Sequence, residues 1–391
     1  MLPLFLITFV NVLGFGLIIP LLPFYIERVS GGPEIVTLVV ALYALVQFLM
    51  APTIGRLSDR HGRRPVLIWT TVAVIGSHLL LAFADSLWLV ILARTIGGIA
   101  AGNVGVIFAY VTDISSGAER SKSMGYIGAA FSLGFMFGPA IGGLLAGTDV
   151  ETANFMVPAL SAAGLTVIAL GCLIAFLPES LTPEQRSDAS GNGALPLGEQ
   201  LRAAFSNHTF TMLAAIAFLL YVTWSSMLSI FALWTNRVLE LGPRDIGLIF
   251  MYTGIIGTIC QLGLIAPLTR RLGEATVLMI TIVAMGIGAW IMADASTLVI
   301  VLVAMTLLST GHSVFSPVST SLVSQYAQPN ERGLLLGLFQ GVGSLGRVVG
   351  PAYAGTAFVQ IGIGSPFMIG ALLMVPCALL SFVVIRRPAP A

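Results

Sequence analysis

The sequence predicts an all-α membrane protein of twelve transmembrane helices in two pseudo-symmetric six-helix halves, and three observations predict it. Of the 391 residues, 57% are hydrophobic and 9% are charged, whereas a soluble domain carries about 25% charged residues. Apolar stretches of about 20 residues, the length that crosses a bilayer, recur along the whole chain. The second half of the chain repeats the polar punctuation of the first. A water-soluble fold is therefore excluded.

Short polar segments separate the apolar stretches, and we expect each stretch to form one membrane-spanning helix. The net charge of +1 argues against a nucleic-acid partner and leaves the lipid bilayer as the expected environment. The twelve expected spans are 2–25, 36–55, 65–84, 87–111, 123–146, 155–177, 209–233, 246–268, 275–293, 298–323, 333–358 and 366–385.

Lysine and arginine residues are distributed unevenly between the two sides of the membrane. With the N-terminus placed in the cytoplasm, the inner loops and the C-terminus hold thirteen of the eighteen basic residues, and the outer loops hold only Arg28, Arg237 and Arg244. Loops rich in lysine and arginine stay in the cytoplasm. We therefore expect a multi-pass protein of the plasma membrane, the inner membrane in a bacterium, with both termini cytoplasmic.

The longest polar segment divides the chain into three parts: a first half at 1–178, a linker at 179–207 and a second half at 208–391. Within the linker, apolar residues recur every four positions at Leu197, Leu201 and Phe205. This spacing predicts a short helix on the cytoplasmic membrane surface, and a disordered tether is the alternative.

The two halves are internal repeats. A shift of 212 residues places Glu119-Arg120 on Glu331-Arg332, and Gly138-Pro139 on Gly350-Pro351. Six spans repeated with matching punctuation are typical of transporters whose halves move around a central site.

The segment 55–65, after the second span, reads GRLSDRHGRRP. This pattern resembles the cytoplasmic loop signature of the major facilitator superfamily. The resemblance implies that the glycine allows close helix packing and that the aspartate meets a helix N-terminus, where a carboxylate is favourable by about 0.3 to 1 kcal/mol. It also implies an ion pair between Arg63 and Asp113. The expected conformational switch comprises Gly55, Asp59, Arg60, Gly62, Arg63, Arg64 and Asp113.

The fourth span contains an arginine, Arg94, on the same predicted face as Gly98 and Gly102. This arrangement resembles another motif of the superfamily, which implies a role for Arg94 in proton coupling. A charge at the centre of a membrane costs at least about 2.5 kcal/mol, so such an arginine faces a partner or an aqueous cavity. The alternative is a structural arginine bonded to backbone carbonyls.

The fifth span reads GFMFGPAIGG at 134–143. This pattern resembles the antiporter signature of the superfamily. The proline removes one helical hydrogen bond and the glycines allow tight packing, as a hinge requires. A purely structural helix crossing would use the same small residues. The hinge candidates are Gly134, Gly138, Pro139, Gly142 and Gly143.

The first half also resembles the tetracycline/proton antiporters, with one departure. Those transporters carry an aspartate in the first span, where this sequence has Asn11, and another in the third span, near Ser77 and His78. All seventeen acidic residues lie in expected loops or at span ends. The usual proton-binding acid is therefore missing, which puts tetracycline transport itself in doubt.

The polar residues expected deep in the membrane are basic or neutral. His312 is a second candidate for proton coupling because histidine titrates near neutral pH; a simply hydrogen-bonded histidine is the alternative. A cavity lined by Arg94 and Arg347 would attract anionic or zwitterionic molecules, although Arg347 could instead serve helix packing. The candidate substrate-binding residues are Asn11, Tyr43, Gln47, Tyr221, Trp224, Gln261, Gln340 and Arg347.

Three functions remain open from the sequence. The first is a monomeric exporter of amphipathic small molecules, driven by protons and working by alternating access. The second is an organic-anion carrier of the same fold with little or no proton coupling. The third is a non-transporting receptor, which the intact switch motif disfavours. An enzyme is not expected, because no nucleophile, phosphate-loop or metal-ligand pattern is present, and no cofactor is expected either.

Overall fold

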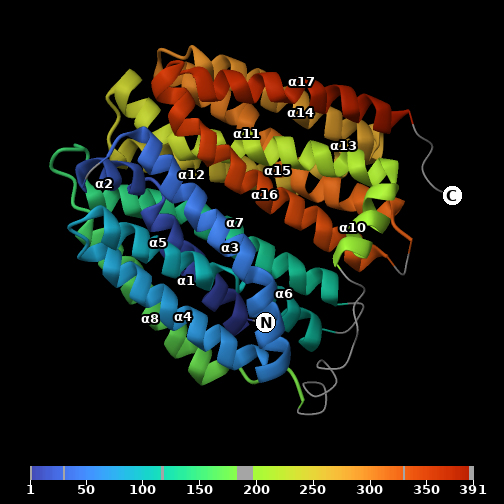
Figure 1. The fold of residues 1–391 in the computed structure, drawn as a ribbon, viewed down its shortest axis with the longest axis horizontal. Coiled ribbons are helices and arrows are strands. Elements are labelled where there is room, and N and C mark those ends of the chain that lie inside the picture. The colour runs from blue at the N-terminus through green and yellow to red at the C-terminus, as the bar shows by residue number, and fades with distance from the viewer. Residues whose placement is uncertain (1, 30, 116–118, 183–196, 329–330, 387–391) are drawn as a thin grey trace. The chain divides into compact units, whose positions relative to one another are not determined.

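The computed structural model describes the chain except for residues 1, 30, 116–118, 183–196, 329–330 and 387–391. The elements of this described part are all helices (Figure 1). Contacts divide the chain into two compact units. Unit 1 comprises Met1–Gly193 and Leu241–Met251, and unit 2 comprises Ala194–Glu240 and Tyr252–Ala391. Residues 183–196, about half of the expected linker at 179–207, lie outside the described part.

Unit 1 begins with a broken helix and continues with longer ones. Its helices are α1 (Leu2–Ile18), α2 (Leu22–Val29), α3 (Pro33–His61), α4 (Arg63–Ala82), α5 (Leu87–Ala101), α6 (Val104–Ile114), α7 (Arg120–Ala146) and α8 (Met156–Phe176). The axes of α1 and α2 differ by 44°. Pro20 lies in the break, where its missing N–H would interrupt a continuous helix. The buried core includes Leu4, Val66, Tyr110 and Leu173.

Unit 2 contains the second set of helices and, from Tyr252 onward, the rest of the chain. Its helices are α10 (Leu197–Ser206), α11 (His208–Leu239), α14 (Glu274–Ala293), α15 (Leu298–Tyr326), α16 (Arg332–Gln360) and α17 (Ser365–Ile385). A further span, Pro243–Leu272, consists of α12 (Pro243–Ile259), a π-helical turn η1 (Cys260–Leu264) and α13 (Ile265–Leu272). The boundary between the two units falls within α12.

The two units use the same helix pairings. In unit 1, α1 packs against α7 and α8, and α4 packs against α5 and α8. In unit 2, α11 packs against α16 and α17, and α14 packs against α15 and α17. These pairs correspond under the 212-residue repeat, so the internal similarity in sequence is also a similarity in packing.

The number of expected spans is confirmed. In the described part of the chain, eleven helical segments are long and apolar enough to cross a membrane, and the bent pair α1–α2, taken as one span, supplies a twelfth. Several helices extend beyond the expected ends; α11, for example, continues to Leu239 instead of ending at position 233. The short linker helix is present as α10, and Leu201 and Phe205 on it are exposed.

The switch motif is not a loop, which corrects the expectation from sequence. Helix α3 runs to His61, so Gly55, Asp59 and Arg60 lie in its last two turns. Gly62 alone separates α3 from α4 and has a φ of 100°, a conformation that glycine adopts without strain. The helix continues through these polar residues because α3 extends beyond the apolar part of its span.

Candidate functional site

Arg94 is a buried cation on α5, with 6% of its surface exposed. Its guanidinium carbon lies 4.2 Å from the centroid of the Tyr43 ring and 5.7 Å from that of Phe15. The two rings stack on each other with centroids 5.5 Å apart. An arginine over an aromatic face gains about 0.5 to 2 kcal/mol. Helices α1, α3 and α5 therefore build one cation–π site within unit 1.

Two glycines allow α5 to approach its neighbours at this site. A Cβ at Gly98 would lie 2.9 Å from the carbonyl oxygen of Tyr43, and one at Gly97 would lie 2.8 Å from Ser77 Oγ. Any larger residue would push α3 and α4 away from α5. The Ser77 hydroxyl also donates a hydrogen bond to the Ala93 carbonyl at 2.8 Å, which joins α4 to α5 directly beside Arg94.

The guanidinium of Arg94 has no hydrogen-bond acceptor among the described residues, and its Nε is fully buried. The alternative of an arginine bonded to backbone carbonyls is therefore not what this structure shows. Aromatic faces stabilise its charge, and no acidic side chain in the described part of the chain forms a salt bridge with it. Since a charge in hydrocarbon is costly without a partner, this arrangement suits an anionic or strongly polar group brought by a ligand.

The other unit 1 candidates are arranged differently. Gln47, one turn after Tyr43, donates a hydrogen bond to the Ala101 carbonyl at 3.2 Å. Two atoms are buried and have no hydrogen-bond partner among the described residues: Oδ1 of Asn11 and Nδ1 of His78 on α4. Gln47 thus serves to join α3 to α5, while the unpaired atoms of Asn11 and His78 remain available.

Unit 2 holds a second arginine on an aromatic ring. The guanidinium carbon of Arg347 on α16 lies 4.9 Å from the centroid of Tyr221 on α11. Its Nη2 donates a hydrogen bond to Ser344 Oγ at 2.8 Å, and Ser344 donates in turn to the Gln340 carbonyl at 3.0 Å. Only the main chain of Gln340 takes part in this contact, and its side chain is exposed.

His312 and Trp224 complete the unit 2 group. Their rings stack with centroids 4.1 Å apart and an interplanar angle of 5°. Tyr221 contacts His312 edge to face at 5.9 Å. The structure therefore brings four predicted residues together in unit 2, contributed by α11, α15 and α16. Gln261 is not among them: it lies on the π-helical turn η1, where it is exposed.

Two glycines of α16 position Tyr221. A Cβ at Gly343 would lie 2.8 Å from Cε2 of the Tyr221 ring, and a Cβ at Gly346 would lie 2.7 Å from the Phe218 carbonyl oxygen. The tyrosine ring lies against α16 only because both positions lack a side chain. This close packing fixes the ring under the guanidinium of Arg347.

The switch motif forms a charged network around Arg63, the first residue of α4. Its Nη1 lies 2.5 Å from Asp59 Oδ1 and donates a hydrogen bond to Ser58 Oγ at 2.6 Å. Its Nε donates to Asp113 Oδ2 at 3.2 Å, so the ion pair expected between Arg63 and Asp113 is present. The network links α3, α4 and α6. Arg60 takes no part in it and is exposed.

Sequence reasoning missed Glu179. Its two carboxylate oxygens accept hydrogen bonds from the backbone N–H groups of Arg63 and Arg64, at 2.8 and 3.1 Å. The side chain of Arg64 also donates to the Ile174 carbonyl at 2.7 Å. The first N–H groups of a helix have no partner within the helix, so a carboxylate here is favourable. The feature of the sequence that could have identified it is an acidic residue directly after the sixth expected span.

Three glycines of α7, namely Gly134, Gly138 and Gly142, pack on α1. A Cβ at Gly134 would lie 2.7 Å from Val12 Cβ, and a Cβ at Gly138 would lie 2.7 Å from Gly16 Cα. At Gly142 the backbone of Leu17 approaches still more closely. Gly143 faces the backbone of Pro243, which belongs to the same unit. This tight seam has no room for side chains on α7.

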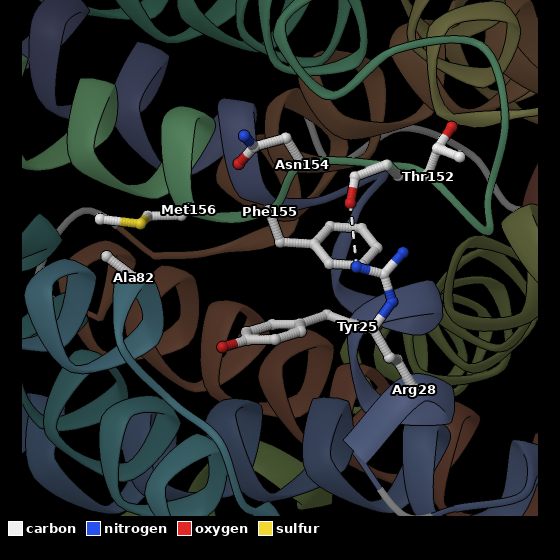
Figure 2. Close-up of a pocket in the computed structure, with 8 residues that line it drawn as sticks. Tyr25, Arg28, Ala82, Thr152, Asn154, Phe155 and Met156 are labelled. Atoms are coloured by element: carbon white, nitrogen blue, oxygen red, sulfur yellow. Dashed lines mark hydrogen bonds between the residues drawn. The ribbon is translucent and has the colours of Figure 1, made fainter.

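A shallow cavity of about 330 Å³ lies between the end of α2 and the segment before α8. Figure 2 shows Arg28 lying along the ring of Phe155, and its guanidinium carbon is 4.4 Å from that ring's centroid. Arg28 donates hydrogen bonds to the carbonyls of Ala153, Val150 and Glu151, at 2.9, 2.7 and 3.0 Å. Because protein carbonyls use these donors, Arg28 holds the 150–155 segment and does not offer a free cation.

Comparison with known proteins extends over nearly the whole chain. The model of the Major Facilitator Superfamily matches residues 4–265 and 262–391. Multidrug resistance protein 2 of Bacillus subtilis (strain 168) is 28% identical over 368 residues, which cover 94% of this chain and 90% of that protein. The class C tetracycline resistance protein of Escherichia coli is also 28% identical, over 94% of this chain and 92% of its own length.

A solved structure has the same fold. The crystal structure of the human organic anion transporter MFSD10 matches with a TM-score of 0.72 and 23% identity, covering 97% of this chain and 98% of that one. At this identity the likeness concerns the arrangement of helices alone.

Proposed function

Because the chain belongs to the major facilitator superfamily, we propose that it exports amphipathic small molecules across the membrane by alternating access. It is a multi-pass integral membrane transporter and not an enzyme. The multidrug and tetracycline resistance proteins that it resembles over most of their length support export as the direction of transport.

One structural observation carries the substrate class. Each unit places an arginine over a tyrosine ring inside a membrane-spanning helix bundle, at 4.2 Å for Arg94 and 4.9 Å for Arg347. The aromatic faces suit the apolar part of an amphipathic molecule. The guanidinium groups suit its polar or anionic part. Such a site accepts molecules with both parts better than purely apolar ones.

We propose that the proton gradient drives transport, with protons moving in as the substrate moves out. Arg94 and His312 are the candidates that the sequence offers for proton coupling. An arginine remains charged in proteins, so Arg94 would act through its charge, whereas His312 would carry the proton. The buried Nδ1 of His312 has no protein partner, which leaves this atom available.

A second candidate function is an organic-anion carrier with weak proton coupling or none. The observation that favours it is the absence of an acidic side chain from the middle of every expected span. An arginine without a carboxylate partner attracts anions, and a transporter without a membrane-embedded acid lacks the usual proton-binding group.

The switch network is the proposed latch between conformations. Arg63 forms salt bridges with Asp59 and Asp113 at one end of unit 1, and none of the contacts described for these three residues involves the arginine–tyrosine site. We place this end, and both termini, on the cytoplasmic side of a bacterial inner membrane, and we propose that the transporter works as a monomer without a cofactor.

Transport by purified protein in liposomes tests these proposals. An imposed pH gradient is combined with fluorescent dyes that are matched in size and are cationic, zwitterionic or anionic. Dye movement that follows the proton gradient supports the antiporter. Anion movement that is independent of the gradient supports the organic-anion carrier. Absence of any protein-dependent flux would contradict both.

A further inference from the structure

Two aromatic rings of unit 2 stack on each other, and a third ring links them to a cation. Trp224 and His312 are almost parallel and 4.1 Å apart. Tyr221 contacts His312 at 5.9 Å and carries the Arg347 guanidinium carbon 4.9 Å above its own ring. Tyr221 therefore contacts both the stacked pair and the guanidinium. We call these four residues the Trp224–Arg347 cluster.

The charge of Arg347 is not neutralised by the protein. Its hydrogen bond goes to the neutral hydroxyl of Ser344, although a guanidinium has five N–H donors. It lies near the middle of the 29-residue α16, roughly 20 Å from either end at 1.5 Å per residue. Glu240, Glu274, Asp294 and Glu331 lie at helix ends of the same unit. Among the described residues, no acid forms a salt bridge with Arg347.

We infer that the Trp224–Arg347 cluster binds a planar aromatic carboxylate, an inference that rests on the proposed transport function and narrows its substrate class. A guanidinium holds a carboxylate with two parallel hydrogen bonds. Flat aromatic rings stack on Trp224 and His312 better than puckered or flexible chains do, because ring faces gain energy beyond area burial.

Charge balance selects a monoanion. In the state in which His312 carries no proton, the cluster offers one positive charge, that of Arg347. A phosphate dianion would leave one negative charge unpaired in a low-dielectric site, which is costly. A carboxylate or another singly charged anion leaves none.

Equilibrium binding to the purified full-length protein in detergent tests the inference by calorimetry. The probes are 2-naphthoate, its neutral amide 2-naphthamide, the aliphatic cyclohexanecarboxylate, and a naphthyl trimethylammonium salt. We expect 2-naphthoate to bind at least about tenfold more tightly than 2-naphthamide and the trimethylammonium salt, the ratio that a charge-assisted hydrogen bond of about 1.5 kcal/mol gives. It should also bind more tightly than cyclohexanecarboxylate, which keeps the carboxylate but has no aromatic face to stack.

Three variants test separately the preference for a carboxylate and the preference for an aromatic ring. Arg347→Gln should abolish the preference of 2-naphthoate over 2-naphthamide, and Arg347→Lys should keep part of it because the charge remains. Trp224→Leu should abolish the preference over cyclohexanecarboxylate. Trp290→Leu is the matched control, because Trp290 is 58% exposed on α14 of the same unit and should leave all four affinities unchanged.

The outcomes separate this inference from the proposed function. Equal binding of 2-naphthoate and cyclohexanecarboxylate to the wild type, or a uniform loss for every probe in Arg347→Gln and Arg347→Lys, would overturn the inference even if dyes are transported in liposomes. Selective binding of 2-naphthoate without any flux in liposomes would support the cluster and contradict the transport function instead.

Discussion

The Glu179 carboxylate accepts a hydrogen bond of 2.8 Å from the backbone N–H of Arg63, so an acid after α8 caps the start of α4. The same side chain also accepts from the N–H groups of Arg64, Ser180 and Leu181. A negative charge at a helix N-terminus is favourable, and loss of a capping side chain costs about 0.5 to 2 kcal/mol.

We therefore expect Glu179→Ala to lower the free energy of unfolding by about 1 to 2 kcal/mol. Glu179→Gln should cost less, because the amide oxygen still accepts a hydrogen bond. Thermal unfolding of the purified protein in detergent measures both. Glu119→Ala is the control, since Glu119 precedes α7 without a side-chain cap. Equal unfolding temperatures for the two alanine variants would show that Glu179 is not a cap.

The switch variants Asp59→Asn and Arg63→Ala should impair transport while substrate affinity stays nearly unchanged. Arg63 bonds to Asp59 and Asp113 at one end of unit 1, so its loss alters the balance between conformations and not the site. A latch worth about 1.5 to 3 kcal/mol corresponds to roughly a tenfold or larger loss of flux. Binding and flux are measured separately.

Arg56→Ala is the matched control for the switch. Arg56 is exposed on the same helix, and its side chain bonds only to the carbonyl of Pro52, one turn earlier. It should transport normally. If affinity falls in step with flux in Asp59→Asn or Arg63→Ala, these residues belong to the substrate site and the latch assignment is wrong.

The fold was largely predictable because span length is a physical requirement of the bilayer. Twelve apolar stretches predicted twelve spans, and the repeat predicted which pairs of helices correspond. The helix ends were less predictable: polar residues such as Asp59 and Arg60 suggested a loop, yet α3 continues through them to His61. The π-helical turn at Cys260–Leu264 has no signal in composition or periodicity.

The candidate site was predictable as residue types and not as contacts. Arg94 and Tyr43 were both named from the sequence, but positions this far apart meet only after three helices have packed. The same holds for Trp224 and His312. The capping role of Glu179 was not predicted, because linkers also contain acids close to the end of a span. Only the structure shows its side chain at the N-terminus of α4.

In the seam between α1 and α7, Gly138→Leu or Pro139→Leu should give a folded protein trapped on one side. A Cβ at Gly138 already lies 2.7 Å from Gly16 Cα, so a larger side chain must hold the helices apart, at about 1 to 3 kcal/mol. Labelling of single cysteines placed on each side reports which side is open.

Gly128→Leu controls for bulk on the same helix, because a Cβ at Gly128 meets no atom within 4 Å. This variant should label and transport like the wild type. Normal transport and unchanged labelling in Gly138→Leu would contradict the hinge assignment.

Arg94 should favour anions at the unit 1 site. Organic anions or zwitterions should compete with a transported dye better than permanent cations of similar size do. Arg94→Ala should weaken the anions selectively by about five- to 150-fold, the equivalent of 1 to 3 kcal/mol. Tyr43→Leu should have a smaller effect in the same direction, since it removes one cation–π contact of about 0.5 to 2 kcal/mol. Equal losses for anions and cations would return Arg94 to a packing role.

His312 is the group through which proton coupling can be separated from binding. An arginine does not release its proton near neutral pH, whereas a histidine side chain can. Nδ1 of His312 is buried and has no hydrogen-bond partner among the described residues. His312→Phe keeps a flat ring against Trp224 but removes the nitrogen atoms. We expect this variant to bind 2-naphthoate within about threefold of the wild type, because ring stacking contributes most of the contact, and to transport independently of an imposed pH gradient. His78→Phe, which makes the same change on α4 of unit 1, is the comparison variant in the same liposomes. If His312→Phe still responds to the gradient as the wild type does while His78→Phe does not, the proton is carried in unit 1, and the assignment to His312 is wrong.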